Sequence, residues 1–191
     1  MIFAEPDPAA ANSKFTQALL TDPTSPAHLF LLNSGNTNFN SRECHAAEIG
    51  SANGITNGRG LAGMYAPLAN GGGKLVGADT LARMGRVAMA THEDATLLIP
   101  SRFALGFMKS MDNRKEPNAP NSSCIMSDAA FGHVGMGGSI GFADPECRMS
   151  FGYNMNRMGA GILLNTRGQA LVDAAYTALG YRSNASGVWA M

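Results

Sequence analysis

The most constraining feature of the sequence is a glycine-rich stretch at residues 131–145, FGHVGMGGSIGFADP. It contains two strand-like runs, at Ala130–Gly135 and Ser139–Ala143, and a third run with alternating large apolar residues follows at Met149–Met155. Asp144 and Pro145 suit a type I turn, so the second and third runs should form an antiparallel hairpin. Glycine weakens a strand unless something must approach its backbone closely. The stretch therefore predicts either a strand pair lining a cleft or a core pair with bulges.

Helical periodicity flanks these strands and indicates an α+β fold with packed helices. Residues 57–70 place apolar side chains at i, i+3, i+4 and i+7, with Asn57 or Thr56 available as the N-cap. Further helices are expected over Lys14–Leu20, Asp79–Ala88 and Arg167–Leu179, and a strand over Phe103–Phe107. We expect the rest of residues 1–50 to be an irregular connection and residues 182–191 to be a loose tail.

Charge and composition exclude several classes of protein. Lys plus Arg number 14 and Asp plus Glu number 14, with no basic run, so no nucleic-acid partner is expected. A chain that is 45% hydrophobic with no net charge is not globally disordered. No apolar run approaches the roughly 20 residues of a membrane span. Residues 1–7 lack the pattern of a signal peptide, so we expect an intracellular protein without a membrane span, in an unspecified compartment.

The cysteines argue against a disulfide framework and against a metal site. Cys44, Cys124 and Cys147 are odd in number and widely spaced, which favours reduced thiols. Cys44 and His45 are adjacent, which is poor spacing for metal ligands, and neither C-x-x-C nor H-x-x-x-H occurs. No metal and no cofactor are therefore expected.

One local motif points to a nucleophile, but its context does not. Gly137–Gly141 match G-x-S-x-G, which requires the Ser on a sharp turn between a strand and a helix. Here Ser139 is followed by another strand-like run. An enzyme that uses Ser139 with His133 as its base is therefore the least favoured reading.

Five pieces of the chain together carry a family resemblance. They are Glu48–Gly54 with the helix after it, Phe103–Phe107, Phe131–Pro145, Tyr153–Met158, and Arg167 with the helix after it. In this order and spacing they resemble the serine β-lactamase-like hydrolases, also called the penicillin-recognising fold. The similarity is greatest to the class C-like esterases and the animal β-lactamase-domain proteins, and it covers roughly Glu48–Tyr181.

The resemblance implies a particular active-site chemistry. In that family the Ser of an S-x-x-K motif attacks an acyl carbonyl, while the Lys and the Tyr of a Y-x-N motif move protons. A third motif, K-T-G or H-x-G, lines the cleft, and the resemblance places it at His133-Val134-Gly135. His133 would then lie near the substrate, and the Met136 backbone N–H would be one oxyanion donor. Val134, Gly135 and Gly137 would form the substrate-binding surface.

Two departures from the family pattern change what is expected. Val134 stands where the family often has a Thr that bonds a substrate carboxylate, so neutral esters or peptides fit better than penicillins. No Ser has a Lys three residues on, and no Tyr has an Asn two residues on. Because both motifs lie upstream in the family, we expect residues 48–181 to be the C-terminal portion of its domain, after a partly helical lead-in at residues 1–47. The missing strands would leave a sheet edge open.

Two functions remain open on the sequence. The first is a serine hydrolase of the esterase type, acting on small-molecule or peptide esters or amides through an acyl-enzyme and represented here by its C-terminal half. The second is a non-catalytic fragment or pseudoenzyme that acts as an interaction module. Its open sheet edge would pair with an N-terminal half or with a second copy of the chain.

Overall fold

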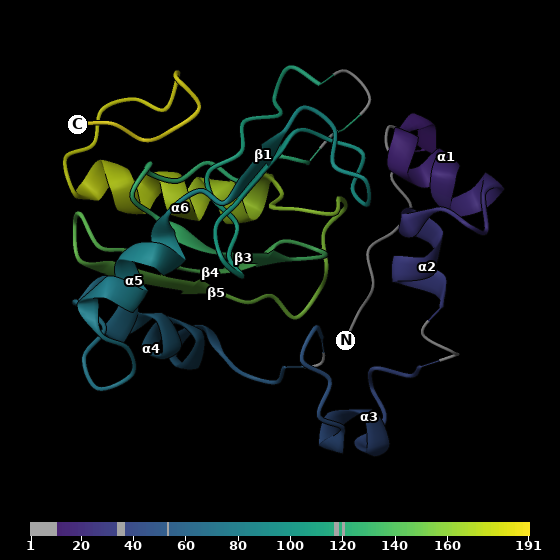
Figure 1. Cartoon of the computed structure of the whole chain (residues 1–191), viewed down its shortest axis with the longest axis horizontal. Coiled ribbons are helices and arrows are strands. Elements are labelled where there is room, and N and C mark those ends of the chain that lie inside the picture. The colour runs from purple at the N-terminus through teal and green to yellow at the C-terminus, as the bar shows by residue number, and fades with distance from the viewer. Residues whose placement is uncertain (1–10, 34–36, 53, 117–118, 120) are drawn as a thin grey trace.

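The computed structural model describes residues 11–33, 37–52, 54–116, 119 and 121–191 (Figure 1). Its strands are β1 (Met89–Thr91), β2 (Ser101–Phe103), β3 (Phe131–Gly135), β4 (Ser139–Asp144) and β5 (Met149–Tyr153). Its helices are α1 (Lys14–Thr21), α2 (Pro26–Leu32), α3 (Arg42–Ala46), α4 (Gly58–Ala69), α5 (Ala78–Gly85) and α6 (Thr166–Ala178). An antiparallel sheet with helices packed on it confirms the expected α+β class.

The three predicted strands form one antiparallel sheet in the order β3-β4-β5. Phe142 is the reference point for the register, because it pairs with Gly132 on β3 and with Phe151 on β5. The β4–β5 turn is stabilised by Asp144, whose Oδ1 accepts a hydrogen bond from the Glu146 N–H at 3.0 Å. The predicted hairpin is therefore confirmed, with its strand ends shifted by one or two residues.

One face of the sheet packs against α6 and forms the main core. Phe142 is fully buried and stacks on Tyr176 of α6, with ring centroids 6.1 Å apart, and on Phe151 at 5.2 Å. Beside these rings, the buried carboxylate of Asp144 accepts hydrogen bonds from the Ser127 hydroxyl at 2.5 Å and the Tyr176 hydroxyl at 2.8 Å. This polar group joins β4 to α6, because a buried carboxylate needs such donors.

The opposite face of the sheet packs against α4. A Cβ on Gly141 would lie 2.5 Å from the Tyr65 ring and 2.8 Å from Leu61, and one on Gly152 would lie 2.5 Å from the Gly58 carbonyl oxygen. Glycine at these two strand positions lets the helix approach the backbone closely. The packing of α4 thus explains the glycines at positions 141 and 152 of the strands.

The expected strand over Phe103–Phe107 is wrong beyond its first residue. Strand β2 ends at Phe103, and a tight turn follows in which the Ala104 N–H donates to the Phe107 carbonyl at 2.8 Å. Gly106 has a positive φ of 80°, and Leu105 is 52% exposed. The apolar alternation was misleading because a glycine in the left-handed region ends the extended backbone. Met108 then bridges Phe103 and Gly132 and so joins β2 to β3.

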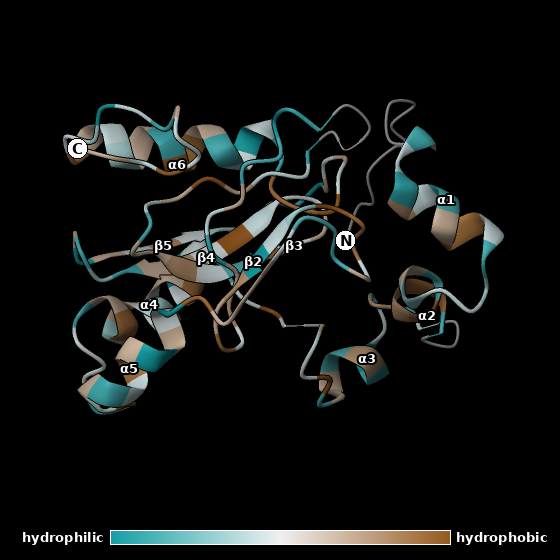
Figure 2. Cartoon of the chain, turned by 45° about the horizontal axis from the view of Figure 1, so that its top comes forward, coloured by the Kyte–Doolittle hydropathy of each residue, from teal (hydrophilic) through white to brown (hydrophobic). Residues whose placement is uncertain are grey.

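Residues 11–50 contain more helix than expected. The predicted helix from Lys14 is confirmed as α1, but α2 and α3 lie where an irregular connection was expected. Both begin at a serine N-cap, Ser25 and Ser41, whose hydroxyl accepts a hydrogen bond from a first-turn N–H at 3.1 Å. These three helices lie to one side of the sheet in both views (Figures 1 and 2).

The C-terminal residues are not a loose tail. Trp189 is 9% exposed, stacks on Tyr176 with centroids 5.8 Å apart, and donates from its indole nitrogen to Asp173 at 3.0 Å. Backbone bridges join Trp189 to Ser127 and Ala190 to Ser183. The tail therefore covers one side of the main core. Within the described residues, no helix is long and apolar enough to cross a membrane.

Candidate oxyanion turn between β3 and β4

The two side chains of the expected H-x-G motif point in opposite directions. His133 is exposed on the α4 side of β3, and its Nδ1 lies 2.7 Å from the carbonyl oxygen of Val134. Val134 faces α6 and is only 5% exposed within the main core. The expected substrate-binding role of Val134 can therefore involve only its backbone, because its side chain is part of the core.

Met136 lies in the turn that joins β3 to β4, residues 136–138, which is called the oxyanion turn below because of the role that the resemblance implies for it. Its side chain is 48% exposed. The N–H groups of the next two residues, Gly137 and Gly138, donate to the carbonyls of Gly161 at 3.4 Å and Gly135 at 3.0 Å. The Met136 N–H, by contrast, donates to no other residue that the structure describes. A backbone N–H without an internal partner is the type of group that stabilises a negatively charged oxygen.

Gly137 is fixed on both sides of its Cα. Its carbonyl oxygen accepts hydrogen bonds from the Gly159 N–H at 2.9 Å and from the Asn165 side-chain amide at 2.8 Å. Its φ is +90°, and that of Gly138 is +102°, both in the region that favours glycine. A Cβ on Gly138 would lie 2.2 Å from the Asn165 amide nitrogen. The backbone next to Met136 therefore has one defined conformation.

Asn165 is the residue that sequence reasoning missed at this turn. It is 5% exposed and is the N-cap of α6, with its Oδ1 accepting from the Gly168 N–H at 3.2 Å. Its Nδ2 makes the bond to Gly137 described above, so one side chain joins the start of α6 to the turn. Asn165 lies two residues before the predicted helix start at Arg167, where an Asn can signal an N-cap, but the sequence does not show where its amide nitrogen points.

Tyr65 of α4 lies beside the same strand. Burial raises the pKa of its phenol, and a hydrogen bond with the backbone of His133 opposes that shift. The phenol consequently stays protonated in the neutral range, where it is a hydrogen-bond group rather than a base. Tyr65 was expected only as part of an apolar helix face, and the sequence carries no Y-x-N at this position.

The structure does not form a Ser139–His133 pair. Ser139 pairs with Gly135 across the β3–β4 ladder, whereas His133 pairs with Gly141. The residues after Ser139 continue as β4 rather than as a helix, so the setting required for a nucleophile elbow is absent at this position. Among the described residues, no three His, Cys, Asp or Glu side chains are grouped so that they could hold a metal ion.

Comparison with known proteins identifies the family. The family model described as Beta-lactamase matches residues 6–176 of the chain. The chain belongs to the Beta-lactamase family. The match begins well upstream of Glu48, where the expected resemblance began, and so includes the segment that contains α1 to α3.

Individual relatives of this β-lactamase-family chain are esterases and a penicillin-binding protein homologue. It is 34% identical over 116 residues to the esterase/beta-lactamase LipL of Mycobacterium tuberculosis (strain ATCC 25618 / H37Rv). The aligned residues make up 59% of this chain and 24% of LipL. A family VIII carboxylesterase structure is 39% identical with a TM-score of 0.60, covering 72% of this chain and 36% of that one. A penicillin-binding protein homologue from Caulobacter crescentus is 29% identical with a TM-score of 0.65, covering 82% and 40%.

The chain thus spans about a quarter to two fifths of the length of these relatives. The S-x-x-K and Y-x-N motifs do not occur in it. The turn that the resemblance assigns to oxyanion binding is therefore found in a sequence without the S-x-x-K and Y-x-N residues that the resemblance also implies.

Proposed function

We propose that this chain contributes the oxyanion side of the active site of a β-lactamase-related serine hydrolase of the esterase type. The observation that carries the proposal is the Met136 N–H, which has no partner among the described residues although the N–H groups of Gly137 and Gly138 both have one. Membership of the Beta-lactamase family and similarity to proteins named as esterases support the reaction class.

The proposed reaction is acyl transfer in two steps. A serine hydroxyl supplied from outside this chain attacks the ester carbonyl carbon, and its proton passes to a base of that same part. The negative charge that develops on the carbonyl oxygen is stabilised by the Met136 N–H and by the N–H of the attacking serine. The alcohol leaves with the proton, and water then attacks the acyl-enzyme by the same route to release the acid.

The other residues of the turn have supporting roles in this proposal. The exposed imidazole of His133 supplies a polar group beside the substrate. Gly135 has no Cβ, which at this position would lie only 2.4 Å from the Ser139 hydroxyl oxygen. Gly137 holds the turn through its bonds to Asn165 and Gly159. A neutral ester is favoured because the middle residue of the motif, Val134, has no hydroxyl for a substrate carboxylate.

A second function is favoured by a different observation. Strand β5 pairs only with β4 among the described residues, so one edge of the sheet has unpaired backbone groups. Such an edge readily accepts another strand. The chain would then be a non-catalytic interaction module that joins an N-terminal half or a second copy of itself through β5.

The experiment that tests the hydrolase proposal combines two measurements. The coding sequence upstream of residue 1 is read for S-x-x-K and Y-x-N, and the polypeptide that it encodes is mixed with this chain. A fluorophosphonate probe should leave this chain unlabelled and should label the upstream polypeptide only when the two are combined. Labelling of Ser139 in the isolated chain would contradict the proposal, and so would an upstream sequence without either motif.

Site variants make the test specific to the turn. His133→Gln should lower p-nitrophenyl butyrate hydrolysis by the combined polypeptides by at least about tenfold, in the range typical for polar catalytic groups. His92→Gln is the matched control, because His92 is exposed and lies outside the turn. Equal loss in both variants, or in neither, would remove His133 from the proposed site. A stable dimer of an unlabelled chain would instead support the interaction module.

A further inference from the structure

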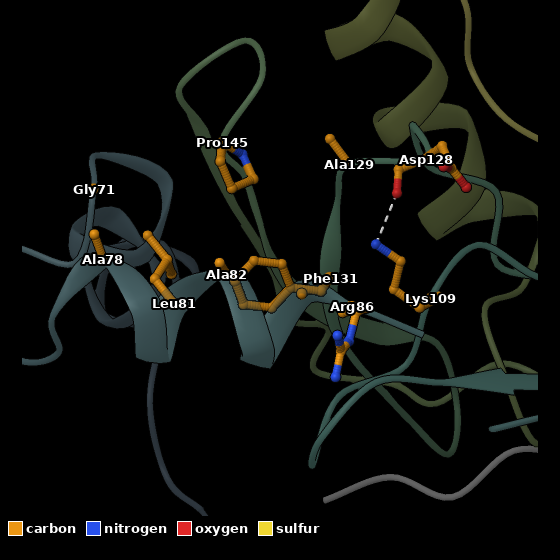
Figure 3. A pocket seen from close by; sticks show the side chains of 11 residues that line it. Gly71, Ala78, Leu81, Ala82, Arg86, Lys109, Asp128, Ala129, Phe131 and Pro145 are labelled. Atoms are coloured by element: carbon orange, nitrogen blue, oxygen red, sulfur yellow. Dashed lines mark hydrogen bonds between the residues drawn. The ribbon is translucent and has the colours of Figure 1, made fainter. Parts of the chain in front are cut away.

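A pocket of about 370 Å³ lies at the end of the sheet opposite the β3–β4 turn. Figure 3 shows the residues that line it. The pocket opens where β3 begins and β4 ends, between α5 and the two separate segments that carry Lys109 and Asp128. Its volume lies within the range of about 300–1,000 Å³ that is usual for small-molecule sites. The apolar part of its wall consists mainly of Leu81, Ala82, Phe131 and Pro145. This combination is suited to an aliphatic group.

The pocket also contains a buried cation. Lys109 is only 3% exposed, and its ammonium donates to the backbone carbonyl of Asp128 at 2.7 Å, which Figure 3 shows as the dashed line. Burial lowers the pKa of Lys109, and the charge of Asp128 opposes this effect. An ammonium has three donor hydrogens, so this bond to a neutral carbonyl leaves donors for a further acceptor.

Among the described residues that line the pocket, Asp128 carries the only carboxylate, and that carboxylate is bound to a residue outside the pocket. Asp128 Oδ1 accepts from the Arg102 guanidinium at 3.2 Å, and the Asp128 side chain is 73% exposed. Arg86, at the C-terminal end of α5, lines the same pocket and adds a second positive charge. With Lys109 and Arg86 against Asp128, the lining residues carry a net charge of plus one. The charges of Asp128 and Asp144 act on Lys109, but among the described residues neither carboxylate forms an ion pair with its ammonium. A bound carboxylate would accept the remaining donors of this buried cation.

We propose that this pocket binds an aliphatic monocarboxylate. Its carboxylate accepts hydrogen bonds from the Lys109 ammonium, with Arg86 at the mouth, and its chain lies between α5 and Phe131. The proposal is independent of the oxyanion turn, since no residue is shared between the two sites. It concerns non-covalent binding and requires no nucleophile.

The probe is sodium octanoate, titrated into the full chain and followed through backbone amide resonances, which report both position and affinity. The largest shifts should map to Ala82, Ala129 and Phe131. Hexanoate should bind about two- to fourfold more weakly for each missing methylene, because each one buried in the pocket contributes to affinity. Uncharged 1-octanol should bind at least about tenfold more weakly than octanoate, since it lacks the charge-assisted bond.

Three variants and a control separate the charge from the cavity. Lys109→Met keeps the length of the side chain and should weaken octanoate binding by about tenfold or more. Ala82→Phe should do the same by filling the pocket, whereas Thr80→Phe, exposed on the same helix outside the pocket lining, should leave affinity within about twofold. Arg86→Gln, at an exposed position, should weaken binding about threefold and carries the charge test if Lys109→Met does not fold.

Several results would overturn the proposal. Octanoate shifts that map away from the pocket, or no shifts at millimolar concentration, would show that the site does not bind carboxylates. Equal affinity for octanoate and 1-octanol would show that the ammonium is not recognised. Unchanged octanoate affinity in folded Lys109→Met or in Ala82→Phe would also contradict it. None of these results bears on labelling by the fluorophosphonate probe, so failure here is distinct from failure of the hydrolase proposal.

Discussion

Replacing Asn165 by Ala tests whether the start of α6 holds the oxyanion turn. The substitution removes two hydrogen bonds made by one buried side chain. Asn165 Oδ1 no longer accepts from the Gly168 N–H at 3.2 Å, and Nδ2 no longer donates to the Gly137 carbonyl at 2.8 Å. The Gly137 carbonyl retains its bond from the Gly159 N–H at 2.9 Å, so it is not left unsatisfied.

The expected cost follows from these two bonds. Loss of an Asn N-cap typically lowers the free energy of unfolding by about 1 kcal/mol. Loss of one neutral hydrogen bond whose partner keeps another donor lowers it by about 1 kcal/mol more. Asn165→Ala should therefore destabilise the chain by about 2 kcal/mol. Asn165→Ser keeps an N-cap acceptor but is too short to reach the Gly137 carbonyl, so it should lose only about 1 kcal/mol.

The chain contains a matched control for the cap alone. Asn57 is the N-cap of α4 and accepts from the Gly60 N–H at 2.9 Å, but it is exposed, and its side chain makes no second bond to any residue that the structure describes. Asn57→Ala should therefore cost about 1 kcal/mol or less. The difference between the two Asn→Ala variants isolates the bond from Asn165 to the turn.

Urea denaturation followed by the fluorescence of Trp189 measures these differences, because Trp189 is the only tryptophan and stacks on Tyr176 of α6. Dilute protein limits any association of the kind proposed for the unpaired edge of β5. Equal losses for Asn165→Ala and Asn57→Ala would refute the reasoning, since the bond to Gly137 would then contribute nothing. A loss in Asn165→Ser as large as in Asn165→Ala would refute the separation into cap and turn.

Three further predictions follow from the same geometry. Tyr176→Phe keeps the stacked ring but removes the hydroxyl that donates to the buried Asp144 carboxylate at 2.8 Å. Urea denaturation should show that the free energy of unfolding falls by about 2 kcal/mol. An unchanged free energy of unfolding would mean that this hydroxyl does not stabilise the carboxylate. Gly138→Ala should destabilise by more than about 1 kcal/mol, because φ is +102° and the new Cβ would lie 2.2 Å from the capping amide; a melting temperature equal to that of the unmodified chain would contradict this. Complete burial raises the pKa of the Cys124 thiol to about 12. Iodoacetamide at pH 8 should therefore modify the partly exposed Cys147 before Cys124, as followed by mass spectrometry. The reverse order would contradict the described core.

The strands and long helices could be predicted from the sequence because their signals are local. The alternation of Met149, Phe151 and Tyr153 depends only on neighbouring residues, and it identified β5 correctly. The packing of residues 182–191 has no such signal. Trp189 of this segment is buried because it stacks on Tyr176 and donates a hydrogen bond to Asp173, and both of these residues belong to α6. Tertiary contacts of this kind are not visible in a periodicity.

The candidate site also has features that could be predicted from the sequence and features that could not. The resemblance pointed to the His133–Gly135 motif and the Met136 N–H, and the described turn leaves that N–H without a protein partner. It also grouped Val134 with His133, although strand alternation sends neighbouring side chains to opposite faces. The sequence carried no sign of the bond between Asn165 and Gly137, because 28 residues separate them and the direction of an amide depends on the folded packing.

The oxyanion role proposed for the Met136 N–H imposes two opposing requirements on the turn. Its N–H must lack an internal partner, which leaves it free for a substrate oxygen, yet its position must not vary, because preorganisation is the source of its effect. The adjacent Gly137 links the turn to the segment after β5, with its N–H bound to Gly161 and its carbonyl bound to Gly159 and Asn165. The rigidity of the turn therefore comes from a segment that follows β5, and not from the β3–β4 ladder alone. A substitution at the start of α6 should alter the turn before it alters the sheet.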